Sequence, residues 1–226
     1  MNYLLFSFIF AFASSATLGQ SVHFHCVINN QKLNLDSVYF FPSLSQYVKI
    51  ESLKFYISQI ELMSGNQSVW KEKDSYHLVD FENAKSTQFS LKPDESVAFN
   101  ALRFSIGIDS ITNVSGSLGG DLDPTKGMYW TWHSGYINCK LEGNFFQSPS
   151  LKKEFKYHIG GYSAPFSTIQ TIDIKGLTEK NINIDFDLSA FISKLDLKSK
   201  PEIMSPGKPG ADLAKSFTGI FKISHP

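Results

Sequence analysis

The chain has 226 residues, and its 21 basic and 21 acidic side chains give a formal net charge of zero. These charges are spread evenly, without a basic patch or an acidic block, and this pattern argues against a nucleic-acid-binding protein. A chain of this length is sufficient for one domain with a substantial hydrophobic core.

The first twenty residues differ in composition from the remainder of the chain. Leu4–Ala13 is an uncharged apolar run that is too short to span a bilayer but has the length of a signal-peptide core. Small residues at Ala16–Gly19 allow cleavage after Gly19 or Gln20. We therefore expect a signal peptide at residues 1–20. The rest, residues 21–226, is expected to be a single exported domain, periplasmic or secreted, without a membrane span.

The mature chain contains two cysteines, Cys26 and Cys139. An even number of cysteines in an exported chain predicts one disulfide, because compartments outside the cytosol are oxidising. Two free, buried thiols are one alternative, and a thiolate ligand of a metal ion is the other.

Short segments in which apolar and polar residues alternate recur along the chain, and they are rich in Phe, Tyr, Ile and Val. Gly, Pro, Asn and Asp separate them, which is the pattern of β-strands joined by turns. We predict strands at Val22–Ile28, Leu53–Leu62, Tyr76–Phe81, Val97–Ile108, Met128–Leu141, Glu154–Ile159, Thr168–Lys175 and Asn181–Leu188.

Helical patterns are few and short. Ser189–Leu195 begins with a potential Ser cap, and Asp212–Phe221 has apolar residues four apart, so each predicts a short helix. Pro201–Pro209 is rich in proline and glycine and is predicted to be a loop. The fold class that follows is all-β, a two-sheet antiparallel β-sandwich with one or two short helices.

The longest polar connection is the segment Ile108–Lys126, and loops of this length are often functional. Its side chains Asp109, Asn113, Asp121 and Asp123 could supply oxygen ligands to Ca²⁺. Their spacing matches no standard calcium loop, and turn formation explains the same residues equally well.

Four histidines are candidate metal ligands, namely His23, His25, His133 and His158. His23 and His25 alternate on a predicted strand, so their imidazoles leave one face about 7 Å apart. Neutral imidazole binds copper, zinc and nickel, although the two could also be a histidine pair on a solvated or half-buried face. His158 precedes two glycines, where backbone can approach a ligand. His77 lies within a well-formed strand, and we expect a structural role for it.

The segment Gly127–Tyr136 contains four aromatic residues, a Met and a His, which are residue types found at soft-metal and redox sites. On one regular strand Trp130 and Trp132 would share a face with Met128, which predicts packing in the core. The alternative is a tryptophan beside a metal ion, either in cation–π contact or as a residue that becomes oxidised. On the same regular strand His133 would point away from both tryptophans, which argues against a single shared site.

Signatures of common enzymes are absent from the sequence. It has no Gly-x-Ser-x-Gly, no His-Glu-x-x-His and no phosphate-binding glycine loop. Its acidic residues are scattered, although the two carboxylates of a glycosidase need not be close in sequence. We expect a protein that is not an enzyme.

Several segments resemble, in order, the blocks of the MbnP-like domain family. The most specific is Met128–Tyr136, where Met-Tyr-Trp-x-Trp precedes Ser-Gly-Tyr. Supporting segments are Phe55–Ile60, His77–Phe81, Phe104–Asp109, Gly119–Pro124 and Tyr157–Gly161. The resemblance covers nearly the whole mature chain, but Cys26 and Cys139 are not part of it.

This resemblance implies an exported, β-rich, copper-binding protein, with methanotroph relatives that lie beside copper acquisition. In that family a partner di-haem cytochrome peroxidase oxidises a tryptophan to kynurenine, and imidazoles and the modified residue then hold copper. By resemblance, Trp130 or Trp132 is the candidate for oxidation. The candidate ligands are His25, His133 and His158, with His23 as a local addition.

We therefore expect an exported protein that binds a copper ion for acquisition or delivery. The alternative is a metal-free β-sandwich whose aromatic strand serves packing or recognises a protein or a glycan.

Overall fold

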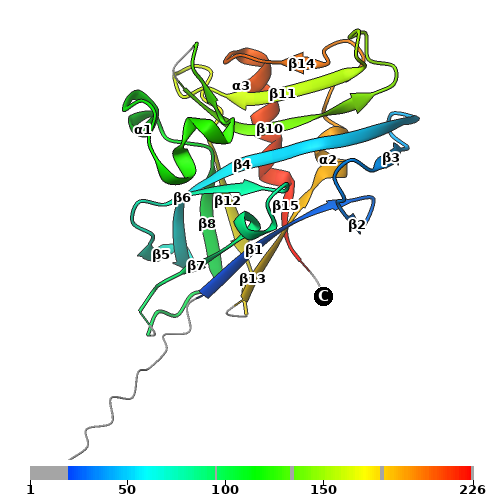
Figure 1. The fold of residues 1–226 in the computed structure, drawn as a ribbon. Helices are drawn as coiled ribbons and strands as arrows, with labels where there is room; N and C mark the ends of the chain where they lie inside the picture. The colour runs from blue at the N-terminus through cyan, green and yellow to red at the C-terminus, as the bar shows by residue number, and fades with distance from the viewer. Residues whose placement is uncertain (1–19, 95, 133–134, 179–180, 225–226) are drawn as a thin grey trace, which may run out of the picture.

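The computed structural model describes residues 20–94, 96–132, 135–178 and 181–224 (Figure 1). The predicted signal peptide, residues 1–20, therefore lies outside the described residues except for Gln20. Two β-sheets form the framework, and the prediction of a mostly β, two-sheet fold is confirmed. Within the described ranges, no helix is long and apolar enough to cross a membrane.

The smaller sheet, sheet A, is built around strand β1 (Gln20–Ile28). On one side of β1 lies β13 (Asn181–Asp187), followed by β15 (Phe221–Ile223); on the other lie β2 (Gln31–Lys32) and β7 (Gln88–Leu91). β1 and β13 run parallel, so the sheet is mixed rather than antiparallel as predicted. Parallel neighbours need a long crossover connection, and here the rest of the domain separates them in sequence.

The larger sheet, sheet B, has the strand order β12-β8-β4-β10-β11-β14, and β3, β5, β6 and β9 attach to its central strands. It is also mixed, because β14 runs parallel to β11. The bounds are β3 (Val38–Phe41), β4 (Gln46–Ser64), β5 (Gln67–Lys71), β6 (Tyr76–Asp80), β8 (Ala101–Ile106), β9 (Tyr129–Trp130), β10 (Gly135–Phe145), β11 (Glu154–Gly160), β12 (Gln170–Lys175) and β14 (Glu202–Ile203).

Strand β4 is 19 residues long and runs across much of the molecule in Figure 1. Its alternation changes phase at Gln59, which has a positive φ of 53°. The pairing with β8 shifts its register between Ser58 and Glu61 at the same place. This bulge explains why Phe55 and Ile60, five positions apart, both reach the main core.

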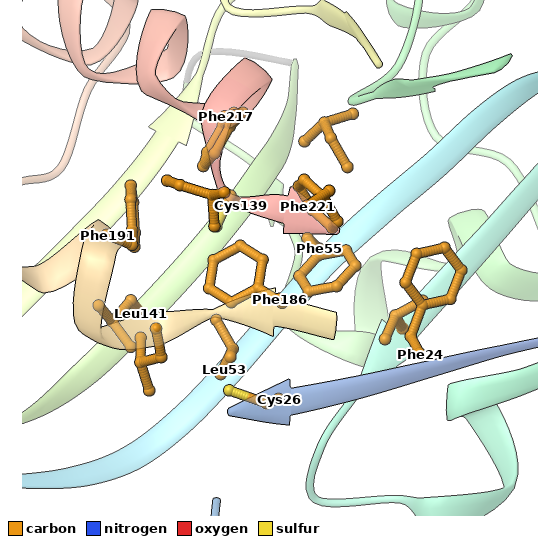
Figure 2. Close-up of a cluster of buried hydrophobic side chains, with 14 of the residues drawn as sticks. Phe24, Cys26, Leu53, Phe55, Cys139, Leu141, Phe186, Phe191, Phe217 and Phe221 are labelled. Atoms are coloured by element: carbon orange, nitrogen blue, oxygen red, sulfur yellow. The ribbon is translucent and has the colours of Figure 1, made fainter. Parts of the chain in front are cut away.

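The main core lies between the two sheets and is made of phenylalanine and aliphatic side chains (Figure 2). Phe55 of sheet B stacks on Phe186 of sheet A, with ring centroids 5.3 Å apart. Phe221 meets both rings edge-on, and Phe24 packs against Phe55 in the same way. Such edge-on and offset contacts are the favoured geometry of aromatic pairs, and they join the sheets without any polar atom.

The predicted strand Met128–Leu141 is wrong in one respect, because it is a hairpin. Strand β9 pairs with the beginning of β10, with Trp130 opposite Gly135, so the chain reverses between them. Thr131 and Trp132 lie in the turn. Apolar residues alternate on both sides of the turn, and periodicity alone does not reveal a reversal of this kind.

Both predicted helices exist, with shifted boundaries. α2 spans Leu188–Ile192 and is capped by the Asp187 side chain, which accepts a hydrogen bond from the Ala190 N–H. α3 spans Lys208–Ala214, starts inside the predicted proline-rich loop, and is followed by the 3₁₀-helix η4 (Lys215–Gly219). Another 3₁₀-helix, η1 (Ala84–Thr87), precedes β7. Proline suits the first turn of a helix, which is why the loop composition was misleading.

Cys26 and Cys139 are free, buried cysteines in the structure, so the predicted disulfide is absent from it. Cys26 is next to Phe186 in sheet A, and Cys139 is next to Phe55 in sheet B. Burial raises the pKa of both thiols well above the ordinary value, so the two groups are uncharged at neutral pH. The alternative of two free, buried thiols matches the structure, and both serve as small apolar side chains of the main core.

Candidate functional site

A second group of buried side chains lies on the face of sheet B that points away from the main core. Phe55 belongs to the main core, whereas Tyr56, the next residue of β4, belongs to this second group. We call the group the outer cluster. Its members are Tyr56, Leu78, Ile108, Leu122, Met128, Trp130, Tyr136 and Ile137.

The long polar segment predicted as a loop covers the outer cluster. It contains helix α1 (Ser110–Val114) and two 3₁₀-helices, η2 (Gly120–Leu122) and η3 (Pro124–Lys126). The Tyr56 hydroxyl donates a hydrogen bond to the Asp121 carbonyl at 3.1 Å. The Tyr136 hydroxyl donates to the Leu122 carbonyl at 3.1 Å and accepts from the Leu118 N–H at 3.0 Å. The tyrosines thus hold the segment through polar tips, and burial raises the pKa of both phenols.

The acidic side chains of this segment stabilise turns. Asp109 caps α1 by accepting hydrogen bonds from the Thr112 N–H and hydroxyl, and it also accepts from the Tyr76 hydroxyl. Asp121 accepts from the Leu78 N–H and pairs with Lys126. The explanation by turn formation fits these contacts, whereas a calcium site needs carboxylates that converge on one point.

Two buried asparagines join the segment to β10. Asn113 donates to the Ile108 carbonyl and accepts from the Tyr136 N–H, both at 2.9 Å. Asn138 accepts from the Ile108 N–H at 3.0 Å and donates to the Thr168 hydroxyl at 2.8 Å. These contacts fix the distance between the covering segment and the hairpin that carries the tryptophans.

Trp130 and Trp132 lie at different depths. Trp130 is 4% exposed and Trp132 is 64% exposed, although their ring centroids are only 6.0 Å apart. The prediction that both share a buried face with Met128 is wrong for Trp132, because the turn carries it to the surface. Within the part of the chain that the structure describes, the buried Trp130 Nε1 has no hydrogen-bond partner.

Gly160 makes room for the Trp130 ring. A Cβ atom at Gly160 would lie 2.7 Å from Trp130 Cζ3 and 2.6 Å from the Tyr136 carbonyl oxygen, and both distances are too short for a side chain. His158 precedes Gly160 by two residues on β11, while Ile159 between them points into the main core. His158 and Gly160 therefore lie on the same face of β11, about 7 Å apart along the strand. This makes His158 a neighbour of the Trp130 ring, which packs on Gly160.

His158 is a buried histidine that is held by a carboxylate. Its Nε2 lies 2.6 Å from Glu142 Oε1 of the neighbouring strand. The hydrogen bond with His158 is the main cause that holds the pKa of Glu142 below its ordinary value, and Lys140 and Lys156 add to it. A carboxylate at one ring nitrogen is the usual arrangement of a metal-binding imidazole, because it fixes the ring and leaves the other nitrogen for the metal. His158 could therefore hold a metal ion through its other ring nitrogen.

His23 and His25 lie on sheet A and share its outer face, since Phe24 between them is part of the main core. Their common face was predicted correctly. His25 Nε2 is 3.3 Å from Asn183 Oδ1 on β13, and His25 also lines a cavity of about 300 Å³ together with Glu82. The main core separates this pair from His158, so the structure does not bring the three histidines together.

His77 is held by two side-chain contacts. His77 pairs with Glu72 at 2.8 Å, and its ring stacks on Phe89 with a centroid distance of 3.8 Å, which agrees with the expected structural role. His133 lies outside the described residues. Over the described ranges, no group of three His, Cys, Asp or Glu side chains converges in a way that could hold a metal ion.

Two features of this site are absent from the sequence prediction. Glu142 is one of the scattered acidic residues of the sequence, and no motif singles out Asn138. Alternation within the strands predicts that Glu142 and His158 both face outward, but only the pairing of β10 with β11 places them side by side.

A scan of protein-family models matches residues 17–205 to the model described as MbnP. The chain belongs to the MbnP family. The match includes His23, His25, the β9–β10 hairpin and His158. A search of curated proteins finds no match to this chain.

A solved structure, MbnP from Methylosinus trichosporium, is similar to this chain with a TM-score of 0.60 and 16% sequence identity. The similarity covers 79% of this chain and 78% of the M. trichosporium chain. At this identity the likeness establishes a shared MbnP fold, and the ligands of this chain have to be argued from its own side chains.

Proposed function

We propose that this protein is an exported copper-binding member of the MbnP family, without enzymatic activity of its own, that acts in copper acquisition or delivery. The family match across residues 17–205 carries the proposal. The periplasm or the cell exterior is the proposed location. The uncharged run at Leu4–Ala13 supports it, because that run has the length of a signal-peptide core.

We place the copper site at the β9–β10 hairpin and the adjacent end of β11. His158 supports this choice, because it is buried, is hydrogen-bonded to Glu142 and lies on the same face of β11 as Gly160, which contacts the Trp130 ring. His133, three residues after Trp130, would supply the second imidazole. Copper(I) is stable with few soft or borderline donors, so two imidazoles and one weak further ligand suffice.

A tryptophan of the hairpin, Trp130 or Trp132, is the proposed site of oxidation to kynurenine, which replaces the indole nitrogen by an aromatic amine that can approach a metal. A di-haem cytochrome peroxidase is the proposed partner. Kynurenine formation has a net gain of one oxygen and loss of one carbon. The intact mass of protein purified from its own cell envelope measures it directly, and an unshifted mass removes the oxidation from the proposal while leaving copper binding in place.

The copper site is tested by titration of purified protein with Cu(I) in competition with a coloured chelator. We expect His158→Ala and His133→Ala to weaken binding strongly, and Glu142→Gln to weaken it by roughly ten- to a hundredfold, because Glu142 orients the ligand. His77→Ala is the matched control, since His77 is also a carboxylate-paired imidazole but lies on β6.

The His23→Ala/His25→Ala double variant tests the competing position on sheet A. Full binding in the double variant supports the hairpin site. If the double variant loses copper while His158→Ala retains it, the site belongs to sheet A and the assignment to the hairpin is wrong. If wild-type protein binds copper no tighter than a variant that lacks His23, His25, His133 and His158, none of these histidines holds a copper site and the proposed site is refuted.

One observation favours a second candidate function, a metal-free binding module. Val38, Phe40 and Tyr47 are exposed, and the pairing of β3 with the beginning of β4 places them on one outer face of sheet B. Phe146, which directly follows β10, is exposed as well. Aromatic residues are enriched in protein interfaces. This surface is remote in sequence from the tryptophan hairpin, so its substitution separates the two functions.

A further inference from the structure

The two tryptophans of the hairpin form a pair that connects the surface with the interior. Trp132 is 64% exposed, whereas Trp130 is 4% exposed. Their ring centroids are 6.0 Å apart and their planes are inclined by 51°, which is within the range of aromatic contacts. An electron can therefore pass between the rings without an intervening residue, and a bulky reagent in solution can touch only the outer one.

Trp130 is enclosed by the protein on the other sides. Its six-membered ring lies against the backbone of Gly160, and it belongs to the outer cluster together with Met128 and Tyr136. The ring of Tyr129, the preceding residue, packs against the Tyr136 ring, with the two ring centroids 4.9 Å apart. The inner end of the pair thus lies in a buried cluster that also contains the oxidisable side chains of Met128 and Tyr136.

The hydrogen bonds of the tyrosine and tryptophan side chains in this cluster determine which of them can lose an electron. The Tyr56 and Tyr136 hydroxyls donate to backbone carbonyls, which are too weakly basic to take the proton that a phenol must release on oxidation. Indole can lose an electron without losing a proton. Among the described residues, no group accepts a hydrogen bond from Trp130 Nε1, and an unsatisfied buried polar group of this kind is one signature of a redox role.

We propose that Trp132 and Trp130 form a one-electron relay that carries oxidising equivalents from the protein surface to the buried indole. A one-electron oxidant at the surface takes an electron from Trp132 and is itself reduced. Trp130 then gives an electron to the Trp132 radical cation, which restores Trp132 and leaves Trp130 as the radical cation. Electrons balance in both steps, and neither step moves a proton.

The relay deepens the proposed oxidation of this hairpin, on which its biological use rests, because it assigns separate roles to the two tryptophans. Trp132 is the point of contact for an external oxidant, such as a high-valent haem iron, and Trp130 is the residue that is modified. A partner then needs access to the exposed turn alone, and the buried site does not have to open.

The test uses metal-free recombinant protein and light-driven oxidation by ruthenium tris(bipyridine) with chloropentaamminecobalt(III) as the electron acceptor, which decays to Co(II) without forming an oxidising radical. The Ru(III) complex formed in light is a one-electron oxidant, and it is too large to reach Trp130. Oxygen uptake at each tryptophan is read by peptide mass mapping, with dark samples as background. Trp70, the half-buried third tryptophan on β5, is the internal reference in every sample.

We expect wild-type protein to show oxidised Trp130. Trp132→Phe should lose that product to the dark background, because phenylalanine is not oxidised under these conditions, while oxidation of Trp70 is unchanged. Trp132→Tyr should restore part of the product at Trp130, since tyrosine can also relay an electron. Trp130→Phe should leave oxidation at Trp132 intact.

Equal oxidation of Trp130 in wild type and in Trp132→Phe would overturn the relay, because Trp130 would then be reached directly. Oxidation confined to Trp132 in wild type would overturn it as well. No copper is present in this experiment, so a failed copper titration leaves its result unchanged. If protein from its own cell envelope has an unshifted intact mass, the kynurenine modification is rejected. The electron transfer from Trp130 to Trp132 is tested separately by the light-driven experiment.

Discussion

The main core and the outer cluster lie on the two faces of the same sheet, and they are built from different chemistry. The main core joins sheets A and B through phenylalanine and aliphatic side chains. The outer cluster contains two tyrosines, a tryptophan and a methionine, and its tyrosine hydroxyls bind the backbone of the covering segment. One face of sheet B thus joins the two sheets, while the other packs a smaller cluster whose tyrosine hydroxyls hold the covering segment in place.

The largest expected effect is in the main core. Phe186→Ala removes a fully buried ring that contacts Phe55, Phe191 and Phe221. The lost contacts and the cavity should reduce the free energy of unfolding by about 3–5 kcal/mol, measured by urea denaturation. Phe40→Ala, at an exposed position, is the control and should change stability by less than about 0.5 kcal/mol. An equal loss in both variants would contradict the division into a core and a surface ring.

An intermediate effect is expected where the outer cluster is attached to β10. Asn138→Ala leaves the buried Ile108 N–H without its acceptor and Thr168 without a donor. An unsatisfied buried group should reduce the free energy of unfolding by roughly 1–3 kcal/mol. Hydrogen exchange should report the loss first in the segment that covers the outer cluster. Asn144→Ala on the same strand is the control, and equal protection of that segment in the two variants would argue against a role for Asn138 in holding it.

The smallest effect is expected at the cap of α1 and depends on pH. Burial raises the pKa of Asp109, but hydrogen bonds from Thr112 and Tyr76 outweigh it and hold the pKa below its ordinary value. A depressed folded-state pKa contributes stability above the unfolded-state pKa of about 3.9, and this contribution is lost as pH falls through the lower folded-state value.

Asp109→Asn should therefore reduce stability by about 0.5–1.5 kcal/mol at pH 7, because asparagine keeps the cap but not the charge. The difference from wild type should diminish in acid, below about pH 4. Denaturant midpoints of both proteins at several pH values measure it. A difference that stays constant down to the acid limit would show that the charge of Asp109 is not what stabilises the helix.

Alternation and turn residues were sufficient to predict the mostly β, two-sheet class and many of the strands. In β13, Ile182, Ile184 and Phe186 alternate with polar residues and fill the core as expected. Their parallel pairing with β1 could not be predicted, because one-sided burial fixes which face is apolar but not the direction of the neighbouring strand.

The site was predictable to a smaller extent. The outward projection of His23 and His25 follows from period-two spacing alone. The division of Trp130 and Trp132 between interior and surface depends on a turn that alternation conceals. The contact between His158 and Glu142 depends on the register of two strands, and no local pattern in either strand specifies that register.

Strand β4 contributes side chains to both the main core and the outer cluster. Phe55 and Tyr56 are consecutive, so a single peptide unit anchors both layers. A substitution that displaces this peptide unit should therefore disturb the packing on both faces of sheet B at once.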